Sequence, residues 1–246
     1  MYKLPVLEII IGAFVVPWRN KQYFLYTLAL PTLVLAGVWA AWVLLQREAS
    51  WTGWFFYVTY FLALSAFAIA CHCLILDKNR TPIPYFSTRF AKRAVSFCLW
   101  FLLIYVISGL VQAFILTIAV NIVNHVDGGD LKTMAQTPYF TWLKFLASVP
   151  GMYLMSRVAL ILPSIAINEK KSIRWSWNVT KNNGLRIFFL TGIFPLLISN
   201  LSGFLWFEEL GGVGYALLWI ITYLGTAIGV FALSLAYREF VSLQTS

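Results

Sequence analysis

Residues 94–123 read AVSFCLWFLLIYVISGLVQAFILTIAVNIV, a run of 30 residues without one formally charged side chain. An α-helix needs about 20 mostly apolar residues to cross the hydrocarbon core of a bilayer. This run therefore predicts a transmembrane helix. The rest of the chain agrees, because 61% of its 246 residues are hydrophobic and 11% are charged, against about 25% charged in a soluble domain. The composition excludes a water-soluble enzyme, a disordered tail and a secreted disulfide scaffold.

Five further stretches are long and apolar enough to cross a membrane. We therefore expect an all-α fold in which residues 1–246 form a single polytopic membrane domain with six transmembrane helices. The six predicted spans cover residues 23–45, 51–76, 94–123, 139–168, 185–207 and 212–237. The N-terminal residues lack the pattern of a cleavable signal peptide, so we expect every span to be retained.

The basic residues are distributed unevenly between the loops that these spans define. Of the 18 Lys and Arg residues, 14 lie on one side, two lie on the other and two lie inside the fourth span. The 14 are Lys3, Arg19, Lys21, Lys78, Arg80, Arg89, Lys92, Arg93, Lys170, Lys171, Arg174, Lys181, Arg186 and Arg238. Short loops rich in Lys and Arg stay in the cytoplasm. We therefore expect both termini to be cytoplasmic.

Two segments on the basic side have the pattern of helices that lie flat at the membrane surface. Residues 172–183 place basic and Asn side chains on one face, and residues 85–93 place three cations opposite two Phe side chains. Such helices attract anionic lipid headgroups, each cation being worth about 1 kcal/mol. The residues expected to face lipid are Arg89, Lys92, Arg93, Arg174, Trp177 and Lys181. Simple anchoring at the interface is the alternative interpretation.

A common plan recurs along the chain. A short amphipathic stretch, a basic turn and an aromatic-rich span follow one another in units that begin near residues 5, 83 and 170. This recurrence predicts three hairpin repeats. The alternative is that the interface selects basic and aromatic residues wherever a helix enters the membrane.

The fourth predicted span contains residues that break helices. Pro150 removes a backbone donor and Gly151 adds conformational freedom, so we expect a kink there. Pro163 is expected to bend the same span a second time. Because irregular backbone at membrane depth must be covered by protein or face a water-filled cavity, the kink is expected to face the other helices.

Arg157 is the strongest candidate for a ligand-binding residue. A cation inside a span costs about 2.5–3.5 kcal/mol and usually faces a partner or a cavity. No carboxylate lies within any predicted span, so its expected partners are carbonyls, a hydroxyl, Gln112 or an anionic ligand. Lys144 is a shallower candidate in the same span. For both cations the alternative is that the side chain reaches the interface.

The residues around this span resemble a known bacterial family. They are Pro150-Gly151-x-Tyr153-Leu154-x-x-Arg157, then Pro163, then Ser176-Trp177-x-x-Thr180-Lys181-x-Asn183. This pattern, within residues 145–195, resembles the YciC-like inner-membrane proteins and the membrane domain attached to some glycerophosphoryl diester phosphodiesterases. The resemblance implies a polytopic inner-membrane protein. It does not imply phosphodiesterase activity, which in the fused proteins belongs to a separate soluble domain.

Residues for catalysis or metal binding are scarce. Cys71, His72 and Cys73 are adjacent on one helix and therefore point in different directions, so they cannot hold one metal ion together. The sequence contains no phosphate-binding glycine loop, serine nucleophile elbow or paired intramembrane carboxylates. We therefore expect a protein without enzymatic activity, metal or cofactor.

The expected function is support of envelope or lipid homeostasis in the bacterial inner membrane. Its partners are expected to be membrane lipids with anionic headgroups, and nucleic acid is not expected. The alternative is a small transporter or lipid-handling protein in which Arg157 binds an anion beside the predicted break, as discontinuous helices do in carriers.

Overall fold

The computed structural model describes residues 3–45, 50–77, 83–127, 138–169, 171–195, 197 and 211–245. These residues are helical apart from short connections, and no strand occurs among them, which confirms the predicted all-α class. The helices are α1 (Val6–Arg19), α2 (Lys21–Leu45), α3 (Ser50–Leu76), α4 (Thr88–Asp127), α6 (Pro138–Val158), α7 (Ile161–Ala166), α8 (Ile173–Val179), α9 (Gly184–Phe188), the π-helix η1 (Phe189–Ile193) and α11 (Gly211–Thr245).

Five helices in the described part are long and apolar enough to cross a membrane. They contain the segments Lys21–Ala41, Gly53–Leu76, Thr88–Ile122, Trp142–Ala166 and Ile220–Gln244. These segments correspond to five of the six predicted spans. The remaining predicted span, residues 185–207, is described only in its first part, where α9 and η1 form a short apolar helix, Gly184–Ile193. Residues 198–207 lie outside the described residues, so the sixth span stays a prediction.

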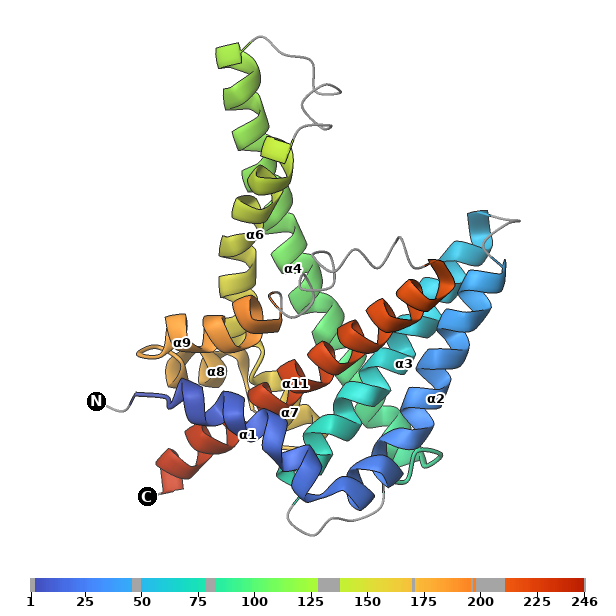
Figure 1. Ribbon diagram of the computed structural model, residues 1–246. Helices are drawn as coiled ribbons and strands as arrows, with labels where there is room; N and C mark the ends of the chain where they lie inside the picture. The colour runs from blue at the N-terminus through green and yellow to red at the C-terminus, as the bar shows by residue number, and fades with distance from the viewer. Residues whose placement is uncertain are drawn as a thin grey trace.

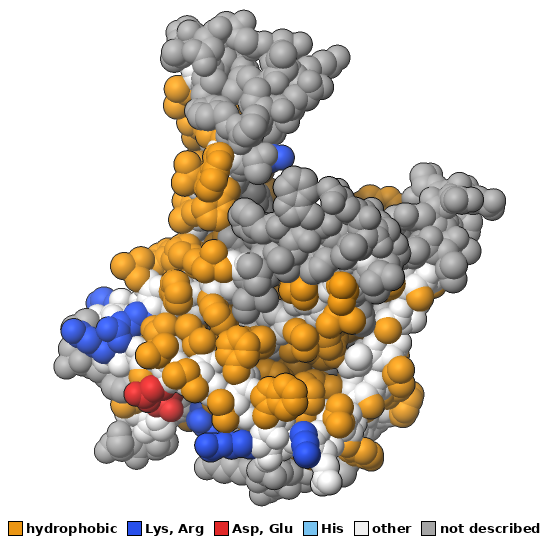
Figure 2. All heavy atoms as spheres, in the orientation of Figure 1, with side chains coloured by type: hydrophobic (Ala, Val, Ile, Leu, Met, Phe, Trp, Pro, Cys, Tyr) orange, Lys and Arg blue, Asp and Glu red, His pale blue; other side chains and the backbone are white. Residues whose placement is uncertain are grey.

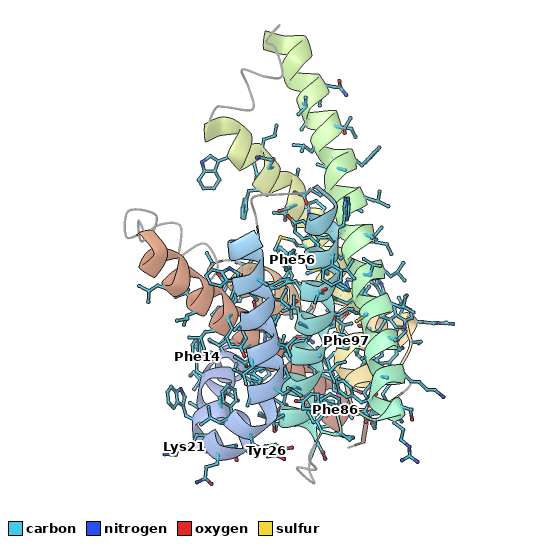
Figure 3. All side chains as sticks on the ribbon, turned by 90° about the vertical axis from the view of Figure 1, so that its right-hand side faces the viewer. Phe14, Lys21, Tyr26, Phe56, Phe86 and Phe97 are labelled. Carbon is cyan, nitrogen blue, oxygen red and sulfur yellow. The ribbon has the colours of Figure 1, made fainter. Side chains whose placement is uncertain are left out.

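The long helices form two groups that diverge from a common base. In Figure 1, α4 and α6 form a hairpin that rises beside the bundle of α2, α3 and α11, while the short helices α1, α7, α8 and α9 surround the base. Both ends of the chain lie at the lower left of this view. Figure 3 shows Lys21 and Tyr26 near the lower end of the molecule and Phe56 high on α3. The base therefore carries the termini and the start of α2.

The outer surface separates apolar from basic side chains. In Figure 2, hydrophobic side chains cover the middle of the visible face, and most of the visible Lys and Arg side chains gather along its lower and left edges. A belt of exposed apolar residues such as Leu103, Leu110 and Phe114 on α4 would be costly in water but suits contact with lipid. This distribution is the one expected for a protein that crosses a membrane with its basic end at one surface.

Helices α4 and α6 approach one another closely at Gly151. A Cβ atom placed on Gly151 would lie 2.6 Å from the backbone oxygen of Ser108 on α4, so only glycine permits this contact. Small residues allow backbones to approach in this way in membrane bundles, where close packing replaces the hydrophobic effect as the force that joins helices. The Gly151 position thus defines how the hairpin is packed.

The predicted kink at Pro150 and Gly151 does not interrupt the helix, and a bend of the helix axis there stays a prediction. Helix α6 runs without interruption from Pro138 to Val158, and the interruption falls at residues 159–160, before α7. Pro163 explains this place, because it has no N–H for the carbonyl of Ala159 and its ring would clash with that carbonyl in a continued helix. The amide of Leu162 instead donates to Ala159 O, at 3.0 Å. The second proline therefore ends the helix, whereas the first is held within it.

The predicted surface helix at residues 85–93 is also corrected. Helix α4 begins at Thr88 and continues into the membrane-spanning segment as one helix of 40 residues. Its start is set by Ser87, whose hydroxyl accepts from the Phe90 amide at 3.1 Å, which is the arrangement of a helix N-cap. The cations of this segment therefore lie on the first turns of a long helix. The three-unit repeat stays a prediction, since among the described residues only α1 and α8 are separate short helices before a predicted span.

The turn before α4 is fixed to the bundle by Tyr85. Its hydroxyl donates to the carbonyl of Thr27 on α2, and its ring meets that of Phe90 edge to face. Burial, the largest cause, raises the pKa of Tyr85 well above its usual value, so the phenol stays a neutral donor. This contact holds the basic start of α4 against the base of the molecule.

Candidate functional site

Arg157 joins α6 to α8 at the base of the hairpin. The residue is only 5% exposed. Its Nε donates to Thr180 Oγ1 at 2.7 Å, its Nη2 donates to the Trp177 carbonyl at 2.7 Å, and its Nη1 donates to the Tyr153 hydroxyl at 3.2 Å. In return, the Arg157 carbonyl accepts from Ser176 Oγ at 2.7 Å. We call this set of contacts the arginine clasp.

Aromatic rings supply the remaining contacts of the guanidinium group. Its central carbon lies 4.2 Å from the centre of the Trp177 ring and 5.9 Å from that of Tyr153, within the range of cation–π attraction. A Cβ atom on Gly184 would lie 2.5 Å from the Tyr153 hydroxyl oxygen, so the start of α9 also closes on the clasp. Residues of the sequence pattern quoted above therefore meet in space, from Tyr153 on α6 to Thr180 after α8.

The structure corrects one of the partners expected for Arg157. The expected carbonyl and hydroxyl partners are present, but Gln112 is not among them. Gln112 Nε2 instead faces the carbonyl of Lys144 at 3.5 Å, a long contact farther along the α4–α6 hairpin. Lys144 itself is exposed. The three predicted ligand residues are thus not brought together into one site.

A basic pocket lies where the start of α4 meets the chain that follows α7. Its volume is about 530 Å³, within the range of ligand-binding cavities. Four cations and one carboxylate line it, together with polar and apolar side chains. The lining residues are Arg89, Lys92, Arg93, Ser96, Trp100, Ile165, Asn168, Glu169 and Lys171.

The far wall of this pocket depends on a tight turn after α7. Asn168 has a positive φ of 61°, a conformation that Asn adopts more readily than most residues. The turn brings Glu169 and Lys171 back toward α4, and Arg93 Nη1 donates to the Ala166 carbonyl at 2.9 Å. The basic pocket is therefore built from two segments, residues 89–100 and 165–171, that are far apart in the chain.

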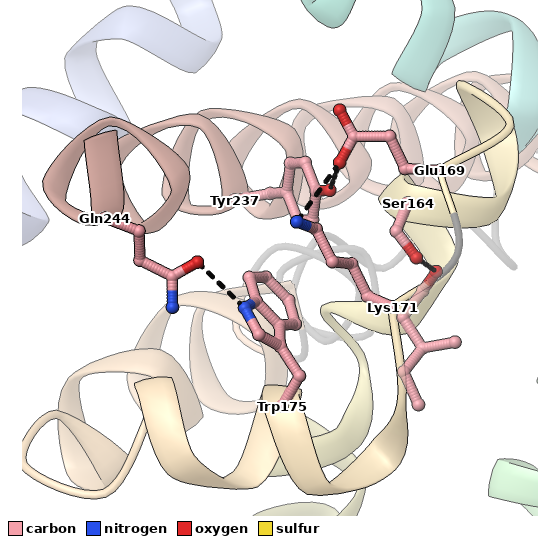
Figure 4. A network of polar contacts seen from close by, with 7 residues as sticks. Ser164, Glu169, Lys171, Trp175, Tyr237 and Gln244 are labelled. Carbon is pink, nitrogen blue, oxygen red and sulfur yellow. Dashed lines mark hydrogen bonds and ion pairs between the residues drawn. The ribbon is translucent and has the colours of Figure 1, made fainter.

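A polar network attaches this wall to α11, as Figure 4 shows. Glu169 accepts from the hydroxyl of Tyr237 and lies 3.7 Å from Lys171 Nζ. Trp175 Nε1 donates to Gln244 Oε1 at 3.0 Å. Among the described residues, Glu169 is the one carboxylate that lines the pocket, and it pairs with Lys171 and Tyr237. The other three lining cations are therefore not balanced by a carboxylate of the pocket, so the pocket is positively charged.

The six residues predicted to face lipid divide between two places. Arg89, Lys92 and Arg93 line the basic pocket. Arg174 and Lys181 are exposed on the α8 side of the base, while Trp177 is 38% exposed and stacks on Arg157. Of these six residues, only the cations on α4 therefore line one pocket.

Sequence reasoning missed the residues that complete the pocket from the second segment. Asn168, Glu169 and Lys171 line it, but the sequence suggested only that Lys170 and Lys171 belong to a basic loop. Their approach to α4 depends on the turn after α7, which has no signal beyond the Asn. The sequence likewise gave no sign that Asn183 Oδ1 would accept from the Leu4 amide, at 2.8 Å.

Neither metal ligands nor known relatives add to this description. Within the described ranges, no group of three or more His, Cys, Asp or Glu side chains is arranged to hold a metal ion. No protein-family model matches the chain, and no curated protein or solved structure shows significant similarity to it. The resemblance to YciC-like proteins therefore stays a prediction from the quoted motifs.

Proposed function

We propose that this chain is a non-enzymatic, multi-pass protein of the bacterial inner membrane that binds anionic phospholipid headgroups at its cytoplasmic surface. The basic pocket carries the proposal. Four cations line a pocket of about 530 Å³ at the end of an apolar helix. The phosphate group of a lipid would lie at the level of these cations, while its acyl chains would lie beside the exposed apolar side chains of α4. Support of envelope or lipid homeostasis follows from binding of this kind.

Charge and place both favour a lipid phosphate over other ligands. Arg89 and Lys92 are exposed at the start of the longest candidate span, where headgroups of the adjoining leaflet lie. Trp100 lines the same pocket about two turns deeper and offers an apolar ring to the glycerol region. Cations near an anionic surface contribute about 1 kcal/mol each.

Transport through Arg157 is less well supported by the geometry. The guanidinium group donates to three protein acceptors and stacks on Trp177, so these contacts account for its burial without a ligand. A carrier of this kind would need a water-accessible path at midplane that reaches the guanidinium group. The arginine clasp is better explained as a structural support for α8.

We expect removal of two pocket cations to weaken binding of an anionic lipid. The variant carries Arg89→Gln and Lys92→Gln, and the probe is dihexanoyl phosphatidylglycerol titrated into the full-length protein in a neutral detergent. At about 1 kcal/mol per cation, the dissociation constant should rise roughly 30-fold. Isothermal titration calorimetry measures the change, which should shrink as salt screens the charges.

The matched control carries Arg174→Gln and Lys181→Gln, which remove the same charge from exposed positions on the α8 side. Its affinity should stay within about twofold of the unmodified protein. Equal weakening by both double variants would refute the pocket and leave only general attraction to the basic surface. Equal binding of dihexanoyl phosphatidylcholine by the unmodified protein would also contradict the proposal.

The orientation of the chain can be tested separately. Fusions of alkaline phosphatase and of green fluorescent protein after Ser246 and within residues 127–132 should report opposite sides of the membrane. Fluorescence, without phosphatase activity, is expected at Ser246 because 14 of the 18 basic residues lie on that side. A periplasmic C-terminus would overturn both the six-span count and the proposed cytoplasmic site.

A further inference from the structure

A second cavity lies inside the bundle, apart from the basic pocket. Its volume is about 210 Å³, and α3, α4, α6, α7, η1 and α11 all contribute to its wall. The wall is predominantly apolar, with side chains such as Phe97, Phe101, Met155, Leu162 and Leu233, and it includes a small number of polar residues: Ser65, His72, Thr191 and Thr226.

His72 is the one imidazole in this wall, and it is almost fully buried, with 1% of its surface exposed. Its Nδ1 lies 2.7 Å from Ser234 Oγ, and Ser234 Oγ lies 2.8 Å from the Val230 carbonyl. Among the described residues, no hydrogen bond is formed by the other ring nitrogen, Nε2. A buried polar atom without a partner costs about 1–3 kcal/mol, so His72, which lines the cavity, has a ring nitrogen that a ligand in the cavity would stabilise.

The nature of that ligand follows from proton accounting. If the single Ser234 proton goes to the Val230 carbonyl, then His72 donates from Nδ1 and Nε2 must accept a hydrogen bond. If Ser234 donates to Nδ1 instead, Nε2 carries the proton and must donate. Because a carbonyl can only accept, the hydrogen bond between Ser234 and Val230 requires the first arrangement. The ligand must therefore donate to Nε2, as a hydroxyl group does and an ether does not.

The other polar residues favour a ligand that donates. The hydroxyls of Ser65, Thr191 and Thr226 each donate to a carbonyl four residues earlier in the chain, at 2.9 Å. They can therefore offer only lone pairs to a ligand. Thr191 belongs to the π-helix η1, and π-helical turns recur at functional sites.

We infer that this cavity binds a neutral amphiphile whose single hydroxyl group is hydrogen-bonded to His72 Nε2 and whose hydrocarbon part lies against the Phe and Leu side chains. The size is suitable, since an apolar cavity of about 150 Å³ binds benzene and this one is larger. The ligand is then a short alcohol or the hydroxyl-bearing segment of a longer lipid. This site takes no part in the proposed binding of headgroups.

The test uses the scarcity of histidine in this chain. The sequence contains only two His residues, so full-length protein labelled with ¹⁵N-histidine in detergent micelles gives a spectrum in which His72 can be assigned with a His125→Gln variant. The probes are 1-hexanol, hexyl methyl ether and hexane. We expect 1-hexanol to shift the His72 Nε2 resonance saturably, and the ether and hexane to leave it unchanged at the same concentrations.

A cavity-filling variant separates binding inside the bundle from partitioning into the micelle. Ala68 lines the cavity, so Ala68→Leu should abolish the saturable shift while His72 stays in place. Ala40→Leu, at an exposed position of α2, adds the same volume outside and should keep the shift.

Three outcomes would overturn the inference. They are an Nε2 resonance that does not respond to 1-hexanol because water alone occupies the cavity, an equal response to the ether or to hexane, and an equal response in the Ala68→Leu variant.

Discussion

Replacing Arg157 with Met should lower the free energy of unfolding by about 3 kcal/mol, because it leaves buried acceptors without their donor. The Trp177 carbonyl and the Thr180 hydroxyl each face the guanidinium group at 2.7 Å. Met fills much of the same space but donates nothing, so the loss isolates the polar contacts of the clasp. The measurement is denaturant-induced unfolding of purified protein in detergent, followed by circular dichroism.

The same variant should release α8 locally. We expect a cysteine placed at Ser176, a buried residue of α8, to react with a water-soluble maleimide faster in the Arg157→Met background than in the unmodified background. Arg157→Lys should be intermediate, because an ammonium group cannot reproduce the planar fork of donors.

Arg174→Met serves as the control for this prediction. It removes a cation from an exposed position of α8, and exposed substitutions usually change stability by less than about 0.5 kcal/mol. If Arg157→Met and Arg174→Met unfold alike, the clasp does not stabilise the fold. If Arg157→Met is fully stable but loses affinity for an anion, the result would favour the alternative in which Arg157 binds a transported anion.

Gly151→Ala should destabilise the protein by about 1–3 kcal/mol, the usual cost of adding a methyl group to a packed interior. The added Cβ would lie 2.6 Å from the backbone oxygen of Ser108 and 2.8 Å from its hydroxyl oxygen. The backbone of α4 cannot rotate away as a side chain would, so the two helices must separate. The fall in the thermal unfolding temperature in detergent measures the effect.

Gly109→Ala is the matched control, one residue along α4 from the contact. A Cβ atom there would meet nothing within 4 Å, and Ala is favoured over Gly in a helix by about 1 kcal/mol. The two glycine substitutions should therefore change stability in opposite directions. The same sign for both would show that the close approach of α4 and α6 is not as described.

Most of the fold could be predicted from the sequence because membrane spans are a local property. Twenty apolar residues must be helical in lipid whatever surrounds them, since no water is present to satisfy the backbone. For this reason five predicted spans, including residues 94–123, correspond to long helices. The error at residues 85–93 concerns a helix boundary, which depends on the cap at Ser87.

The candidate sites could be predicted only in part. The sequence indicated a cation inside a predicted span at Arg157 and a cluster of cations just before the predicted span of residues 94–123. Their partners were not indicated, because Thr180 lies 23 residues from Arg157 and Ala166 lies 73 residues from Arg93. Nothing in the spacing of His72 and Ser234, 162 residues apart, indicated that they share a cavity.

The sequence by itself determined that this chain is helical, apolar enough for a membrane and basic mainly on one side. These properties depend on the free energy of transferring each side chain between water and lipid, which is a property of the single residue. Tertiary structure alone decided that four cations share one pocket, that Arg157 supports α8 and that His72 lines an apolar cavity. These arrangements arise from hydrogen bonds and close contacts between distant segments. Such contacts depend on how helices pack, and helix packing is not encoded in the hydropathy of any single segment.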